Sequence, residues 1–197
     1  MVKAPDTDHR VQLHGVTWDE YETILSIRGD APGVRITYLE GELEFTSPSR
    51  SHELIKSMIG RLLELYLLVN KLRLEGCGTW TVRQRDRDRG AEADECYILT
   101  QGEHDRPDLA IEVVWTHGGI DKLETWRGLA VPEVWIWEAG QIRIFELRND
   151  RFHERTGSGS LPDLDLEEMM SFVVLTNQTG AANAYFERLR GVDLITP

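Results

Sequence analysis

The stretch "DLAIEVV", residues 108–114, decides how the rest of the chain is interpreted. A short apolar run of this kind is typical of a strand that is buried on both faces. It begins with Asp108 and carries a second carboxylate, Glu112, in its interior. An ionised carboxylate inside a buried strand costs several kcal/mol unless it is paired or holds a metal. We therefore expect Glu112 to have either a buried cationic partner, such as an arginine, or a metal ion beside it.

The segments on both sides of this stretch alternate between helix and strand patterns. A T-x-x-E capping box at Thr17 begins the first helix, and apolar residues at helical spacing mark the longest one. Helices are expected at residues 17–27, from Ser49 or Ser51 to about 72, at 120–130, at 165–173 and at 180–190. A hairpin that turns near Gly41 is expected at 34–46, strands at 79–85, 94–99, 108–115, 132–138 and 141–147, and a charged loop at 86–93. This order predicts an α/β (α+β) fold in which one mixed β-sheet is flanked by helices, with the strand at 108–115 central.

The length of 197 residues suits one domain with terminal additions. Residues 1–16 are polar, and we expect a flexible N-terminal segment there. The domain itself is expected at residues 17–175, and residues 176–197 are expected to form a C-terminal helical extension.

Composition excludes several classes of protein. The net charge of −12 argues against a general nucleic-acid coat protein, although it allows a local basic groove or a metal site built from carboxylates. The two cysteines, Cys77 and Cys96, have no zinc-finger or disulfide-framework spacing. No signal peptide and no run of 18 apolar residues is recognisable, so we expect a cytoplasmic protein without a membrane span.

The familiar motifs for phosphate loops, dinucleotide binding, serine hydrolases and zinc proteases are absent, which leaves the carboxylates. Asp94 begins one predicted strand and Glu112 lies in the next, so both can converge at one end of the sheet. Converging carboxylates suit Mg²⁺ or Mn²⁺. Lys122, ten residues after Glu112, could orient or deprotonate an attacking water. The alternatives are a solvated strand end for Asp94, a buried Glu–Arg pair for Glu112 and an exposed helix face for Lys122.

Three ordered segments carry a resemblance to a known family. They are "YLEGELEFTSPSRSH" (38–52), "GAEADECYIL" (90–99) and "RPDLAIEVVWTHGGIDKLETWRGLAVPEVWIWE" (106–138). The chain from Thr17 to Leu175 resembles the stand-alone restriction endonuclease family of the PD-(D/E)XK nuclease superfamily. The resemblance implies a restriction-endonuclease-like fold, Mg²⁺ as cofactor with Mn²⁺ as a substitute, and hydrolysis of phosphodiester bonds in DNA.

The resemblance also implies roles for individual residues. Asp94 and Glu112 would be metal ligands, and Lys122 would assist the attacking water. Glu40 would be a further ligand, directly or through water. His52 matches a recurrent histidine, for which capping or packing is a more natural role than catalysis.

Two positions depart from the pattern of the superfamily. Residue 93 is alanine where the name-giving motif has proline, and position 114 is valine where E-x-K has its lysine. The lysine has therefore either moved to Lys122 or is missing. If it is missing, we expect the fold to be kept without cleavage.

Several readings follow from these observations. The leading one is a Mg²⁺-dependent endodeoxyribonuclease, and the alternatives are a catalytically inactive binding or assembly module and a metal-dependent hydrolase of a smaller phosphate ester. Arg83, Arg85 and Arg87 could contact DNA phosphates or form a self-paired loop. A homodimer is expected because two-strand cleavage commonly uses two sites and twofold symmetry is the commonest closed assembly.

Overall fold

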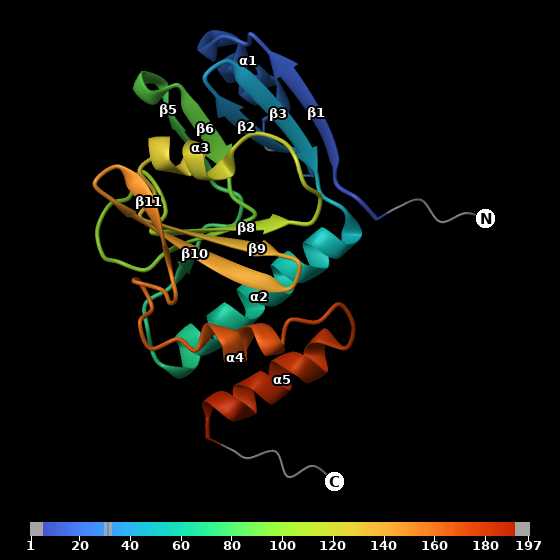
Figure 1. The fold of residues 1–197 in the computed structure, drawn as a ribbon, viewed down its shortest axis with the longest axis vertical. Helices are drawn as coiled ribbons and strands as arrows, with labels where there is room; N and C mark the ends of the chain where they lie inside the picture. Colours follow the sequence, from blue (N-terminus) through green and yellow to red (C-terminus); the bar gives the residue numbers. More distant parts are fainter. Residues whose placement is uncertain (1–5, 30, 32, 192–197) are drawn as a thin grey trace, which may run out of the picture.

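The computed structural model describes residues 6–29, 31 and 33–191. Within these residues the chain forms two β-sheets and five α-helices, so the predicted mixture of helices and strands is confirmed. One sheet lies above the other in the view of Figure 1, and helix α3 (Lys122–Gly128) lies between them. The expectation of a single sheet is wrong, because the N-terminal strands form a sheet of their own.

The larger sheet contains the stretch from which the interpretation began. Its strand order is β11-β10-β9-β8-β7-β4. The strands are β4 (Glu75–Gly76), β7 (Glu95–Ile98), β8 (Leu109–Val114), β9 (Glu133–Glu138), β10 (Gln141–Arg148) and β11 (Arg151–Arg155). Strands β8 and β9 are parallel and the other neighbours are antiparallel, so the sheet is mixed. Strand β8 lies inside the sheet, as the sequence predicts.

The two faces of β8 meet different surroundings because side chains alternate along a strand. Leu109, Ile111 and Val113 belong to the apolar core on the side of helix α2 (Arg50–Val69). Glu112 lies on the opposite face, where Ala110 packs in a second core with Trp126 of α3. Glu112 therefore faces the space between the two sheets.

The remaining helices cover α2 on the side away from the sheet or cap the smaller sheet. Helix α2 begins after the N-cap Ser49, one of the two predicted caps. Helices α4 (Leu166–Ser171) and α5 (Gln178–Leu189) pack against it (Figure 1). None of the described helices has the length and apolar character needed to cross a membrane.

The smaller sheet is antiparallel throughout, in the order β1-β3-β2-β6-β5. Its strands are β1 (His9–His14), β2 (Arg35–Leu39), β3 (Glu42–Ser47), β5 (Thr81–Gln84) and β6 (Arg89–Glu92). Helix α1 (Trp18–Arg28) packs on one face and begins with the predicted capping box of Thr17 and Glu20. The predicted hairpin is confirmed, and its two turn residues Glu40 and Gly41 both have positive φ, which suits a two-residue turn.

Four strands differ from expectation, one of which is the two-residue strand β4, which pairs with β7. Residues 9–14 form β1, although a flexible segment is expected there, because this edge strand has both faces exposed and therefore a polar sequence. Residues 89–92 form the buried strand β6 instead of a charged loop, because its charges are paired inside the protein. Strand β11 is an additional hairpin partner of β10. The parts of the predicted terminal segments at 1–5 and 192–197 lie outside the described residues, and the boundaries at 17 and 175 stay predictions.

Gly90 on β6 supplies a first test of the packing between α1 and the smaller sheet. A Cβ at this position would lie 2.6 Å from Cζ of the buried Tyr21 ring. Since neither backbone nor ring has room to move, we expect Gly90→Ala to lower the free energy of unfolding by about 2 kcal/mol. Urea denaturation measures this change. Gly157→Ala is the matched control because a Cβ at Gly157 meets nothing within 4 Å; equal losses in both variants would contradict the packing described.

Candidate active site

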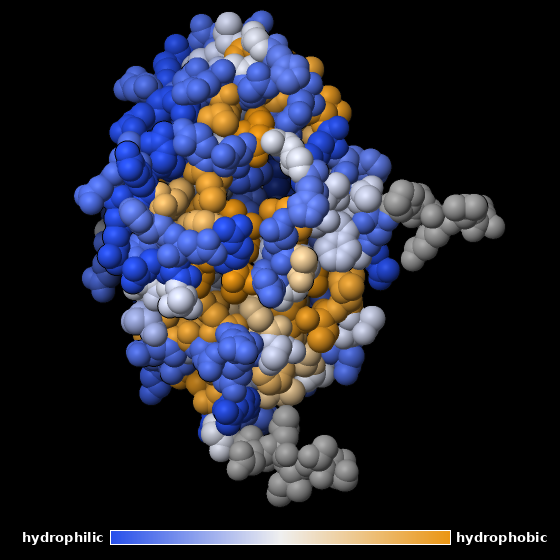
Figure 2. Space-filling model, viewed as in Figure 1, coloured by the Kyte–Doolittle hydropathy of each residue, from blue (hydrophilic) through white to orange (hydrophobic). Residues whose placement is uncertain are grey.

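A cavity of about 200 Å³, with several charged side chains in its wall, lies where the two sheets approach each other. Its walls come from strands β2, β3 and β8, the start of α2 and the loop and helix that follow β8. Figure 2 shows a recess with hydrophilic side chains on this side of the molecule. The cavity brings together four residues that the sequence singles out, which are His52, Asp94, Glu112 and Lys122.

Asp94 directly precedes β7 and is 3% exposed. Its Oδ1 lies 2.9 Å from Nε of Arg35, and its Oδ2 lies 3.0 Å from Nε2 of His52. The backbone N–H of Val113 also donates to Oδ2, at 2.7 Å. Burial acts to raise the pKa of this carboxyl, but the adjacent imidazole of His52 and the charge of Arg35 outweigh it and lower the pKa to about 2. Asp94 is therefore a firmly ionised group.

Glu112 is 4% exposed and has much weaker cationic support. Its Oε1 accepts a hydrogen bond of 2.8 Å from Nε1 of Trp126, and its Oε2 lies 3.8 Å from Nζ of Lys122. Burial raises the pKa of Glu112, Lys122 lowers it and the negative charge of Asp94 raises it again, so that it reaches about 7. The expected buried arginine pair is therefore not its main partner, and the carboxylate retains capacity for another cation.

Lys122 is the first residue of α3, after the N-cap Asp121. Its Nζ donates to Oγ1 of Thr37 on β2 at 2.8 Å. This bond holds the ammonium group between the two sheets and close to Glu112. Lys122 thus brings an ammonium group from the following helix close to Glu112, and that it replaces the lysine of E-x-K stays a prediction.

His52 joins Asp94 to the N-terminal segment. Besides Nε2 on Asp94, its Nδ1 lies 3.1 Å from Oδ2 of Asp8, and Asp8 Oδ1 accepts a hydrogen bond of 2.8 Å from the backbone N–H of Ser49. Burial acts to lower the pKa of His52, but Asp94 and Asp8 outweigh it and raise the pKa. His52 therefore links two buried carboxylates, which goes beyond the capping or packing role expected from sequence.

Two buried charged residues of the cavity wall were not singled out from the sequence. Arg35 bridges Asp94 and Glu53, to which its Nη2 donates at 2.8 Å. Glu44 on β3 is buried and accepts hydrogen bonds from Gln12 and from the backbone of Ile120, both at 3.1 Å. The sequence gives no signal for either residue, because each alternates with apolar neighbours (Ile36, Leu43 and Phe45) as on the outward face of an amphipathic strand.

The other predicted residues lie elsewhere. Glu40 is in the β2–β3 turn, where its side chain is 66% exposed and accepts a hydrogen bond of 2.9 Å from Arg89; it does not line the cavity. Arg83 and Arg85 pair with Glu22 and Asp19 of α1, and Arg87 lies beside them, so this group faces α1 instead of the cavity. Contact of these three arginines with DNA stays a prediction.

The cavity offers the kind of ligand that a divalent cation prefers, but only a small number of such ligands. In the part of the chain that the structure describes, no group of three or more His, Cys, Asp or Glu side chains is arranged to hold a metal ion. However, Mg²⁺ commonly binds through one or two carboxylates and completes its shell with water and substrate phosphate. Asp94 and Glu112 line the same cavity, and their mutual repulsion, which contributes to the raised pKa of Glu112, is what a cation would relieve.

Asp8 provides a test of how the N-terminal segment supports the site. Its side chain is buried and bonds both the N-cap region of α2 and His52. Because Asp8→Ala leaves these donors without an acceptor, we expect the free energy of unfolding to fall by about 2 kcal/mol. Urea denaturation measures the loss, and Asp105→Ala, in an exposed loop, is the control. An unchanged denaturation midpoint in Asp8→Ala would contradict this arrangement.

Comparison with models of protein families gives a match over most of the chain. The model of the Uma2 family, described as "Putative restriction endonuclease", matches residues 18–176. No curated protein matches the chain. The matched range nearly coincides with residues 17–175, and it leaves out β1 and Asp8.

Proposed function

The chain belongs to the Uma2 family of restriction-endonuclease-like proteins, and from this premise we propose that it is a metal-dependent endonuclease that hydrolyses phosphodiester bonds in DNA. The observation that carries the proposal is the pair of buried carboxylates, Asp94 and Glu112, beside Lys122 in one cavity. Restriction-endonuclease-like families generally use divalent metals. Here Asp94 and Glu112 would hold the ion, which would supply positive charge against the negative charge that develops on the phosphate.

The residues of the chain itself would orient the reacting groups. Lys122, held by Thr37, presents N–H donors to a water molecule or a phosphate oxygen near Glu112. Arg35 and His52 keep Asp94 ionised and fix its two oxygens. The apolar surroundings of Trp126 reduce solvation of the site, which strengthens each of these electrostatic interactions.

Circular DNA gives the direct test of endonuclease activity because it has no ends. Wild-type protein with Mg²⁺ or Mn²⁺ is expected to open circular DNA, tested as both duplex and single-stranded circles, and EDTA is expected to stop the reaction. Gel electrophoresis detects nicked and linear products. Failure to open any circle at a tenfold molar excess of protein would count against the proposed function.

The same assay separates the alternatives. A binding or assembly module leaves all circles intact, whereas a hydrolase of smaller phosphate esters cleaves bis(4-nitrophenyl) phosphate but no DNA. We further propose that Mg²⁺ is the preferred ion, that the protein forms a homodimer and that it is cytoplasmic. The molar mass of the protein in solution tests whether it is a homodimer.

A further inference from the structure

The loop between β8 and α3, residues 115–121, determines where Lys122 lies, because Lys122 is the first residue of α3 and directly follows this loop. Figure 1 shows the loop rising from β8 beside β3 to α3. Gly118 and Gly119 have φ of +97° and +101°, a backbone conformation that suits glycine. Because glycines leave a chain many accessible conformations, the place of this loop depends on its contacts with other segments.

The N-terminal segment contacts this loop at three positions that are two residues apart. The three hydrogen bonds run from Nε1 of Trp115 to the carbonyl of Asp6 at 2.7 Å, from the backbone N–H of Asp8 to Oγ1 of Thr116 at 3.1 Å, and from Nη1 of Arg10 to the carbonyl of Gly118 at 2.7 Å. The contacts occur in the same order along both segments. The loop therefore follows the N-terminal segment for most of its length.

Glu44 on β3 holds the end of the loop that adjoins Lys122. Its buried Oε2 accepts a hydrogen bond from the backbone N–H of Ile120 and another from Nε2 of Gln12, both at 3.1 Å. Gln12 on β1 lies opposite Glu44 in the pairing of β1 with β3. A Cβ at Gly119 would overlap the same oxygen. The loop therefore approaches Glu44 as closely as a glycine allows.

Hydrogen bonds are the main contacts between the loop and the N-terminal segment. A cavity of about 270 Å³ lies between them. The described residues that line it are polar or glycine, namely Asp8, Arg10, Gln12, Thr116, His117 and Gly119. Since this wall offers no apolar packing that could fix the loop, the place of the loop depends on the individual hydrogen bonds.

We infer that residues 6–12 and Glu44 position Lys122 for the reaction by fixing the loop that precedes it, with Arg10 and Glu44 as the principal positioning residues. The inference rests on the proposed function, because it takes the role of Lys122 in cleavage from there. Residues 6–12 lie outside the range 18–176 that the family model matches. The N-terminal segment is thus a working part of the site in this chain.

Acetylation by acetic anhydride, followed by peptide mass spectrometry, shows how firmly Lys122 is held and does not require cleavage. Gly119→Ala forces either the loop or the carboxylate of Glu44 to move, and both movements break the hydrogen bond to Ile120. Gly118→Ala is the matched control, because its φ is nearly the same but its Cβ would meet nothing within 4 Å. Lys122 is expected to be acetylated about fivefold faster in Gly119→Ala than in Gly118→Ala, as the loss of one hydrogen bond allows.

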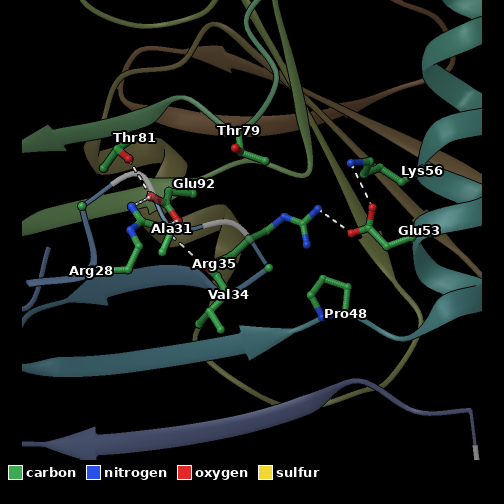
Figure 3. Close-up of a pocket in the computed structure, with 12 residues that line it drawn as sticks. Arg28, Ala31, Val34, Arg35, Pro48, Glu53, Lys56, Thr79, Thr81 and Glu92 are labelled. Carbon is green, nitrogen blue, oxygen red and sulfur yellow. Dashed lines mark hydrogen bonds and ion pairs between the residues drawn. The ribbon is translucent and has the colours of Figure 1, made fainter.

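Lys56 in the same sample controls for general unfolding. Figure 3 shows Lys56 on α2 directed toward Glu53, and its side chain is 17% exposed, close to the 21% of Lys122. Its rate of acetylation is expected to be the same in both glycine variants. Equal rates at Lys122 in the two variants, or a rise at Lys56 as large as that at Lys122, would overturn the inference whether or not the protein cleaves DNA.

Cleavage of circular DNA tests the contribution of Arg10. Arg10→Met keeps the aliphatic part of the side chain but removes the donor to Gly118, and it is expected to lower kcat about fivefold with little change in KM. Arg10→Lys keeps a charged donor at this position and is expected to recover most of the loss. Equal losses in the two variants would overturn the inference and leave the endonuclease function standing. Absence of cleavage by the wild type would instead contradict the proposed function, and acetylation of Lys122 would still decide the inference.

Discussion

Asp94→Asn is expected to lower the rate of DNA cleavage by about 10³-fold or more. The amide has the size of the carboxyl group and can still accept the hydrogen bond from Val113, but it lacks the negative charge that would hold a divalent cation. Metal ions contribute several kcal/mol to the stabilisation of a phosphoryl transition state, and each 1.4 kcal/mol is roughly a tenfold change in rate. Single-turnover cleavage of circular DNA with Mn²⁺ measures the effect.

Asp108→Asn is the matched control for this variant. Asp108 begins the same "DLAIEVV" stretch, but its Oδ2 accepts hydrogen bonds from the backbone of Leu99 and Thr100 and does not face the cavity. Its replacement is expected to leave the cleavage rate within twofold of wild type. Full activity in Asp94→Asn, or equal losses in the two variants, would show that the carboxylate pair is not where cleavage occurs.

Glu112→Gln is expected to stabilise the metal-free protein by about 3 kcal/mol at pH 8. In the folded protein the pKa of Glu112 is raised from 4.5 to about 7, so the folded state holds a proton that the unfolded state releases. The stability linked to this proton is complete below pH 4.5 and is lost as the pH rises to about 7. Each pKa unit corresponds to about 1.4 kcal/mol, which gives the expected size of the effect. Glutamine stays neutral and does not incur this loss.

The predicted pH window separates Glu112 from its neighbour. The pKa of Asp94 is lowered from 3.8 to about 2, so the stability linked to Asp94 is lost only as the pH falls through that lower range. Urea denaturation in EDTA should therefore give equal stabilities for wild type and Glu112→Gln near pH 4.5, and a growing advantage of the variant up to about pH 7. Glu103→Gln, in an exposed loop, should follow wild type at every pH. A Glu112→Gln variant that is less stable than wild type at pH 8 would rule out the raised pKa.

Much of the fold could be predicted because several elements carry local signals. The capping box at Thr17, the N-cap at Ser49 and the turn at Gly41 each act within a few residues, so the chain itself reveals them. The strands β1 and β6 could not be predicted in this way. Their polar residues are explained only by distant partners, such as Arg28 and Thr81 for Glu92 on β6. The division into two sheets likewise depends on long-range pairing.

The site was predictable to the extent that a buried charge is visible in sequence. Glu112 stands out because its neighbours are apolar, and Lys122 follows at a distance that one loop can span. Arg35, Glu44 and Asp8 carry no such mark, because each belongs to a segment that reads as part of an amphipathic strand or a polar terminus. Only the packing of the smaller sheet against α2 and α3 brings Arg35 and Glu44 to the cavity and Asp8 to His52 in its wall.

Calorimetric titration with Mn²⁺ tests most directly whether Asp94 and Glu112 form a cation site. The titration is carried out with thymidine 5′-monophosphate present, so that a phosphate can complete the coordination shell. Wild-type protein is expected to bind one Mn²⁺ per chain, and Asp94→Asn is expected to lose this binding while Asp108→Asn retains it. No binding by the wild type, or unchanged binding by Asp94→Asn, would contradict the account.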